Sequence, residues 1–182
     1  MPFSPVPKRI YSSIFDLRPA DLRAEGVRMI FADLDNTLAR YGQREPSPEL
    51  IEWKDELSDA GIRLFIVSNN RKPTRAAEFS TALGIDFIGH AGKPKRAGFL
   101  QALERTGFTT EETVMIGDQI FTDMLGANNA GIRSWLVMPI RLDSMPRRIR
   151  FAAEGPFRVL CPDDRRTKNS RIHTCQNRRN SI

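Results

Sequence analysis

Four aspartates, one serine and one lysine of this sequence stand next to short apolar runs or next to the start of a helical pattern. They are Asp33, Asp35, Ser68, Lys93, Asp118 and Asp123. Carboxylates that converge repel one another, and a hard cation with oxygen ligands relieves that repulsion. Mg²⁺ fits best, because it binds a few carboxylates together with water and a substrate phosphate. The residue types therefore predict a magnesium site that acts on a phosphate ester.

Four of these side chains suit particular steps of phosphoryl transfer. Asp33 could attack phosphorus and form an aspartyl-phosphate, which divides one difficult displacement into two easier ones. Asp35 could protonate the leaving oxygen and later activate water. Ser68 and nearby backbone N–H groups would bind phosphoryl oxygens, while Lys93 would offset the charge that develops in the transition state. The residues predict a phosphomonoesterase with Asp33 as its nucleophile.

Taken singly, the same residues have simpler interpretations. An Asp-x-Asp sequence after a strand is often only a helix cap or a turn. Ser68 alone could cap a strand end, Lys93 alone could be solvated, and Gly117-Asp118 could form an ordinary turn. Their occurrence in order, each at the end of an apolar run or the start of a helix, favours a catalytic site.

Alternating strand and helix patterns would position these residues. Short runs rich in Ile, Val and Phe predict strands buried on both faces at 27–34, 62–68, 85–89, 113–117 and 132–137. Helical patterns lie between them, at 48–61 with Ser47 as N-cap, and at 73–83, 94–105 and 118–129. The alternation predicts an α/β domain with a mostly parallel sheet and helices on both faces. Ligands of such sheets bind at the carboxyl ends of the strands, where the aspartates lie.

Positive charge is concentrated near the C-terminus. Residues 141–182 contain 11 Lys or Arg and 4 Asp or Glu, and they account for the net charge of +6. We expect 1–140 to form the folded domain and 141–182 to be a basic, partly disordered tail with one short amphipathic helix in 140–160. The tail could contact nucleic acid or an anionic membrane surface, and plain solvation is the simplest alternative.

The apolar runs and the first residues of the sequence indicate where in the cell the protein is located. No apolar run has the length of a bilayer span, and the first residues lack the apolar segment of a signal peptide. We therefore expect a cytoplasmic protein.

The chemical residues also resemble the motifs of the haloacid dehalogenase superfamily. Residues 33–38 match its first motif, Ser68 the second, Lys93 the third, and Gly117-Asp118 with Asp123 the fourth. The resemblance implies a Rossmann-like fold of that superfamily.

The resemblance also assigns roles to the residues. It implies that Asp33 is the nucleophile, Asp35 the acid and base, and Asp118 the main metal carboxylate beside Asp33. The backbone carbonyl of Asp35 would complete the protein ligands of Mg²⁺, and Asp123 would orient Lys93 or the waters on the metal. The supporting and phosphate-binding residues of the prediction are Thr37, Ser68, Asn69 and Lys93.

A narrower resemblance covers about 8–140. Segments 13–22, 31–38, 66–70 and 117–131 are similar to the YqeG family of subclass IIIA phosphatases. That family is similar to the mitochondrial phosphatidylglycerophosphatases, which implies a lipid head group as substrate. Only about thirty residues separate the first motif from the second, too few for an inserted cap domain. We therefore expect no large cap and an open site that suits a large substrate.

Several functions remain open at this point. The expected substrate is a phosphorylated small molecule or a lipid head group, phosphatidylglycerophosphate being the first candidate, with peripheral membrane contact through the tail. A soluble sugar or nucleotide phosphate is an alternative. A nucleic-acid-associated protein is another, although Phe151 and Phe157 are the only aromatic residues of the Phe, Trp and Tyr type in the tail and give stacking on bases little support. No oligomeric state is predicted.

Overall fold

A six-stranded parallel sheet forms the centre of the computed structural model, which describes residues 4–70 and 73–166. Within these residues the strand order is β1-β6-β5-β2-β3-β4. The strands are β1 (Arg9–Tyr11), β2 (Met29–Ala32), β3 (Arg63–Val67), β4 (Asp86–Ile88), β5 (Thr113–Gly117) and β6 (Arg133–Val137). The arrangement confirms the predicted α/β fold with a parallel sheet.

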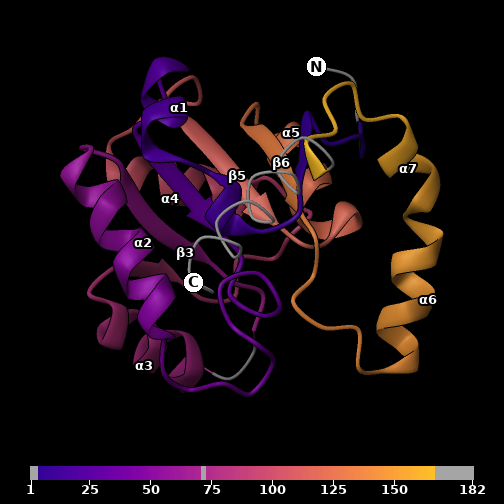
Figure 1. The fold of residues 1–182 in the computed structure, drawn as a ribbon, viewed down its shortest axis with the longest axis horizontal. Coiled ribbons are helices and arrows are strands. Elements are labelled where there is room, and N and C mark those ends of the chain that lie inside the picture. The colour runs from indigo at the N-terminus through magenta and orange to yellow at the C-terminus, as the bar shows by residue number, and fades with distance from the viewer. Residues whose placement is uncertain (1–3, 71–72, 167–182) are drawn as a thin grey trace, which may run out of the picture.

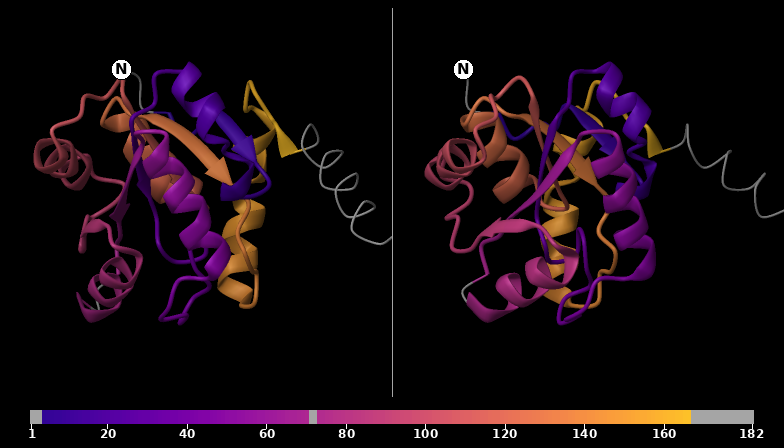
Figure 2. Two further views of the ribbon diagram at one scale, coloured as in Figure 1. Left: turned by 60° about the vertical axis from the view of Figure 1, so that its left-hand side comes forward. Right: turned by 90° about the vertical axis from the view of Figure 1, so that its left-hand side faces the viewer.

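Helices connect the strands and lie on both faces of the sheet (Figures 1 and 2). The α-helices are α1 (Pro19–Ala24), α2 (Pro48–Asp59), α3 (Pro73–Leu83), α4 (Ala97–Thr106), α5 (Leu125–Asn129), α6 (Met145–Ala153) and α7 (Gly155–Val159). A 3-10 helix, η1 (Ile14–Asp16), and a π-helix, η2 (Ile120–Met124), complete the description. The chain passes from β2 to α2 through the single loop 33–47, so no domain is inserted between the first two motifs.

The strands are buried on both faces, as their apolar runs predict. In β2, Ile30 and Ala32 face the core that α1, α2 and α3 cover, and Met29 and Phe31 face the core under α4, η2 and α5. Burial of successive side chains on opposite faces explains why the run shows no alternation with polar residues. The start of α2 is also as predicted, because Ser47 Oγ accepts from Leu50 N at 3.3 Å.

Three elements differ from the predictions. Strand β1 was not predicted, because three residues are too few to show a pattern. The helix predicted at 94–105 begins at Ala97, since 93–95 form a turn in which Lys95 N donates to Gly92 O at 3.0 Å. The helix predicted at 118–129 is divided into η2 and α5, and Asp118 lies in the loop before them.

After β6 the chain forms α6 and α7, two helices where one was predicted. They lie on the side of the molecule opposite α2 and α3 (Figures 1 and 2). The chain then returns to the sheet edge, where Ile10 N donates to Asp163 O at 3.1 Å and Arg165 N donates to Ile10 O at 2.8 Å. Residues 167–182 of the predicted tail lie outside the described residues, and the domain boundary at 140 stays a prediction. No helix within the described ranges is both long and apolar enough to cross a bilayer.

Candidate active site

Two aspartates meet at the carboxyl end of neighbouring strands. Strands β2 and β5 pair in register, with Ala32 opposite Ile116, and Asp33 N donates to Ile116 O at 3.0 Å. Asp33 and Asp118 follow these strands directly, so the parallel pairing brings both to one edge of the sheet. Both side chains are buried.

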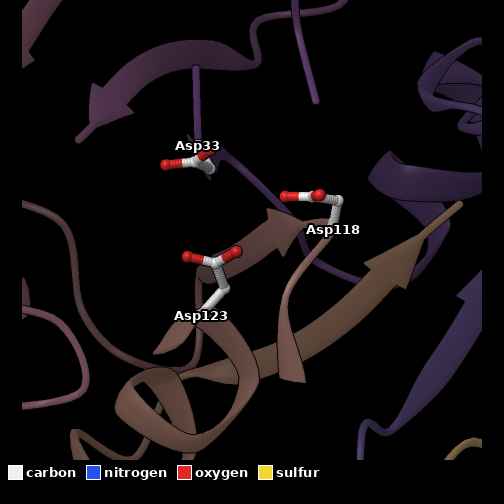
Figure 3. Close-up of side chains that lie close together, drawn as sticks. All are labelled: Asp33, Asp118 and Asp123. Atoms are coloured by element: carbon white, nitrogen blue, oxygen red, sulfur yellow. The ribbon is translucent and has the colours of Figure 1, made fainter. Parts of the chain in front are cut away.

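A third carboxylate, that of Asp123 on η2, completes the cluster (Figure 3). One oxygen from each of Asp33, Asp118 and Asp123 lies within 4.8 Å of the others. Gly117 permits this approach, because a Cβ atom at that position would lie 2.7 Å from the Cβ atom of Asp123. The close packing of η2 on the end of β5 therefore requires glycine at position 117.

Lys93 supplies a buried positive charge to the cluster. Its Nζ lies 2.6 Å from Asp33 Oδ1 and 2.7 Å from Asp123 Oδ1, and it donates to Val67 O at 2.7 Å. The side chain is 1% exposed. Although burial opposes the charged form, the ion pairs with Asp123 and Asp33 raise the pKa of Lys93 above its ordinary value. The ammonium group therefore stays protonated and holds two of the three carboxylates.

One ammonium group does not balance three carboxylates. Burial, partly offset by Lys93 and reinforced by Asp123, raises the pKa of Asp33 to about 6. Burial, reinforced by Asp123 and Asp33, raises the pKa of Asp118 to about 8. Asp118 Oδ1 is buried without a hydrogen-bond partner among the described residues. This excess of close, under-partnered carboxylate oxygens fits a divalent cation that prefers oxygen ligands.

The side chain of Asp35 lies outside this cluster. Its Oδ1 accepts from Arg75 Nε at 2.9 Å and from Arg75 Nη2 at 2.7 Å, and its Oδ2 accepts from Asn70 Nδ2 at 3.1 Å. Arg75 comes from the first turn of α3, which begins at the same edge of the sheet, and it also donates to the backbone oxygens of Gln43 and Arg40. The acid and base role of Asp35 stays a prediction, and the structure shows which side chains hold it.

Of the other predicted residues, Asn69 contacts Lys93 directly. Both polar atoms of the Asn69 amide bind the Lys93 backbone: Asn69 Oδ1 accepts from Lys93 N at 2.8 Å, and Asn69 Nδ2 donates to Lys93 O at 2.9 Å. Ser68 is buried and its Oγ accepts from Asn70 N at 3.1 Å. Thr37 is buried with its Oγ1 unpartnered within the described part of the chain. Asn69 thus orients Lys93, and its contact with phosphate stays a prediction.

Three further residues of the site, Asn36, Arg75 and Glu154, were missed from the sequence. Asn36, at φ 71, donates to Asp118 Oδ2 at 3.4 Å and is bound on both sides of its amide by the backbone of Arg141. The signals for two of them were present, because asparagine tolerates the left-handed region and Arg75 lies in a helix that starts at the active edge. The third, Glu154, accepts from two backbone N–H groups of η2, and no local pattern connects it to the site.

The sequence was compared with known proteins. The model of the family described as haloacid dehalogenase-like hydrolase matches residues 7–131. The chain belongs to that family. It is 40% identical over 135 residues to the "Probable phosphatase YqeG" of Bacillus subtilis (strain 168), covering 74% of this chain and 78% of that protein.

Two further relatives were found for this haloacid dehalogenase-like hydrolase. It is 28% identical over 175 residues to "Phosphatidylglycerophosphate phosphatase 1, chloroplastic" of Chlamydomonas reinhardtii, covering 82% of this chain and 65% of that protein. A crystal structure of an uncharacterized protein from Listeria monocytogenes serotype 4b has a similar fold, with a TM-score of 0.51, 18% identity, and coverage of 68% of this chain and 97% of that chain. The family and its sequence relatives identify this hydrolase as a phosphatase.

Proposed function

We propose that this phosphatase is a magnesium-dependent phosphomonoesterase that works through an aspartyl-phosphate on Asp33. The observation that carries the proposal is the buried cluster in which Asp33 contacts Lys93 at 2.6 Å beside Asp118 and Asp123. Asp33, Asp118 and the backbone carbonyl of Asp35 would hold Mg²⁺, which when bound neutralises phosphoryl charge so that an anionic nucleophile can approach.

In the first step a carboxylate oxygen of Asp33 forms a bond to phosphorus, and the bond from phosphorus to the leaving oxygen breaks. Asp35 gives its proton to that oxygen, and the alcohol leaves. Lys93 stays within reach of the developing charge, and Ser68 with its neighbouring backbone binds the phosphoryl oxygens. In the second step Asp35 takes a proton from water, the water oxygen attacks phosphorus, and Asp33 is released with inorganic phosphate.

The contact between Asp35 and Arg75 suggests when proton transfer becomes possible. In the structure both oxygens of the Asp35 carboxylate accept hydrogen bonds from Arg75 or Asn70, which hold the side chain outside the Asp33 cluster. We propose that Asp35 turns from Arg75 toward the leaving oxygen when the substrate enters. The substrate phosphate, itself a dianion, is then an alternative partner for the Arg75 guanidinium.

For the substrate we propose a phosphate on a lipid head group, phosphatidylglycerophosphate being the first candidate. The similarity to a phosphatase of that lipid supports the choice, as does the absence of an inserted domain in loop 33–47. A surface beside the site also supports it, formed by Met145, Arg148 and Ile149 and named here the α6 face. Met145 is 65% and Ile149 64% exposed, and arginine among exposed apolar side chains on a helix suits an anionic membrane surface.

The proposal is tested by phosphate release from a substrate panel with Mg²⁺. The panel contains phosphatidylglycerophosphate in vesicles, sugar phosphates and nucleotide monophosphates, and Asp33→Asn serves as the blank. We expect the lipid to have the highest kcat/KM. A soluble ester that is hydrolysed faster than the lipid would contradict the choice of substrate, whereas release by Asp33→Asn at the wild-type rate would contradict the nucleophile.

A further inference from the structure

Glu154 is a buried carboxylate that binds the backbone at the start of η2. Glu154 lies beyond residues 7–131, which the family model matches, and it is only 1% exposed to solvent. Its Oε1 accepts from Ile120 N at 2.9 Å and from Phe121 N at 3.3 Å. The first N–H groups of a helix have no partner within the helix, so a carboxylate at this end satisfies them and favours the helix dipole.

The start of η2 follows directly on the short loop that carries Asp118, one of the proposed metal ligands. Asp118 lies two residues before Ile120, and Asp123 lies on η2 itself. Asp123 Oδ2 also accepts from Gln119 N at 3.1 Å, so the three consecutive N–H groups of 119–121 are held by carboxylates. The position of the Asp118 carboxylate thus depends on a backbone that Glu154 fixes from a distant part of the chain.

Glu154 belongs to the segment 140–158, named here the C-terminal strap. Further contacts hold this segment against the rest of the domain. The rings of Phe121 and Phe157 lie 5.5 Å apart, nearly perpendicular. At the other end of the strap, Arg141 binds the Asn36 amide, which in turn donates to Asp118 Oδ2 at 3.4 Å. Because α6 has no buried residue, the strap is fastened at its two ends, by Arg141 before α6 and by Glu154 and Phe157 after it.

The free-energy cost of burying the Glu154 carboxylate supports the view that this residue positions the backbone of η2. A carboxylate loses hydration when it is buried, and this raises the pKa of Glu154, although Phe121, Arg150 and Ile120 oppose the rise. The nearest cation, Arg158 Nη1, is 3.7 Å from Glu154 Oε2, longer than a direct hydrogen bond. The short contacts of Glu154 are therefore those to the loop, and an apolar residue could have filled the space at lower cost.

We propose that Glu154 is a positioning residue for the metal-binding loop: by holding the N–H groups of Ile120 and Phe121 it sets the place of Asp118 and thereby the affinity for the divalent cation. The inference rests on the proposed function and extends it to the C-terminal strap. Partners that orient metal ligands from behind change metal affinity by roughly 10- to 100-fold when they are removed.

The test compares three substitutions at this position in the full-length chain. Glu154→Gln keeps an Oε1 acceptor and the shape of the side chain, Glu154→Leu removes both acceptors, and Glu154→Asp shortens the carboxylate by one methylene. Glu104→Leu is the matched control, since Glu104 is an exposed residue of α4. Mg²⁺ affinity is measured by calorimetry, exchange of the 117–124 amides by mass spectrometry, and Tm by circular dichroism.

We expect Glu154→Leu to weaken Mg²⁺ binding by roughly 10-fold or more and to speed exchange of the 117–124 amides. Glu154→Gln should stay near wild type, and so should the control. Equal Mg²⁺ affinity and equal exchange in wild type and in folded Glu154→Leu would overturn the inference. So would a loss in Glu154→Gln as large as in Glu154→Leu, because charge rather than the acceptor would then be decisive.

Glu154→Asp covers the case in which Glu154→Leu does not fold. We expect it to fold, to bind Mg²⁺ more weakly and to show faster exchange, and wild-type values for both would overturn the inference. A wild-type chain that hydrolyses phosphate esters but binds no Mg²⁺ would overturn both this inference and the magnesium part of the proposed function. Mg²⁺ binding at wild-type affinity in all three Glu154 variants would overturn only the role proposed for Glu154.

Discussion

Asp33 and Asp118 lie at the carboxyl ends of two strands, β2 and β5, whose residues are all buried. Helix α6, on the neighbouring strap, has no buried residue. The two candidate catalytic aspartates follow β2 and β5, which lie in the middle of the sheet and are packed into the core. The strap is held by a few polar and aromatic contacts and keeps apolar side chains exposed. The comparison teaches that the candidate catalytic residues follow strands packed into the core on both faces, whereas α6 lies outside that packing and the strap reaches the site through a few side-chain contacts.

The largest effect should come from Asp33. Asp33→Asn removes the nucleophile while nearly preserving the shape of the side chain, and we expect turnover to fall by about 10⁴-fold or more. Phosphate release measures the loss, and circular dichroism checks that the fold survives. Activity within tenfold of wild type would show that the reaction does not pass through this aspartate.

A substitution at Lys93 tests how much the buried ion pairs of the aspartate cluster contribute to the stability of the fold. Lys93→Met leaves Asp33 and Asp123 without their buried cation, which should cost about 3–5 kcal/mol of unfolding free energy. Arg147→Met is the matched change on α6, where the pair with Asp143 is partly exposed, and should cost under about 1 kcal/mol. Urea denaturation measures both, and similar losses in the two variants would remove the contrast between the regions.

Removal of the metal tests the electrostatics of the edge. EDTA should abolish turnover and Mg²⁺ should restore it. Because the pKa of Asp118 is raised to about 8, this carboxyl holds a proton below that pH, and the cation must displace it. Mg²⁺ affinity should therefore weaken by up to about tenfold per pH unit below pH 8 and level off above it. Calorimetry at several pH values checks this, and an affinity independent of pH between 6 and 8 would contradict it.

The smallest effect is expected on the α6 face. Ile149→Asn should reduce sedimentation with phosphatidylglycerol vesicles by a few-fold, of the order of 1 kcal/mol, since an exposed apolar side chain that would be partly buried in the membrane is lost. Ile51→Asn on α2, also an exposed isoleucine, is the control. Vesicle binding that Ile149→Asn leaves unchanged, or equal binding to phosphatidylcholine vesicles, would separate the α6 face from any membrane.

Much of the fold and part of the site could be predicted locally. Strands β2, β3 and β5 are visible as apolar runs because both of their faces are buried, and parallel strands bring the residues after their carboxyl ends to one edge. That reasoning brings together Asp33, Asp118 and Lys93, and the structure places them in one cluster. The rotation of Asp35 toward Arg75 could not be predicted, because the two residues meet only through the packing of α3 against the loop after β2.

By itself the sequence determined which residues are candidates for the chemistry and at which strand ends they lie, because side-chain type and hydrophobic pattern are local properties. Only the tertiary structure decided which partners each residue takes: Asn69 with the Lys93 backbone, Asn36 with Arg141, and Glu154 with the N–H groups of η2. Such partners are separated along the chain by up to about a hundred residues, and hydrogen bonds depend on distances that no local pattern encodes. The segment 140–158 therefore belonged to a predicted basic tail in the sequence, and in the fold it contacts Asn36 and the start of η2 beside the candidate active site.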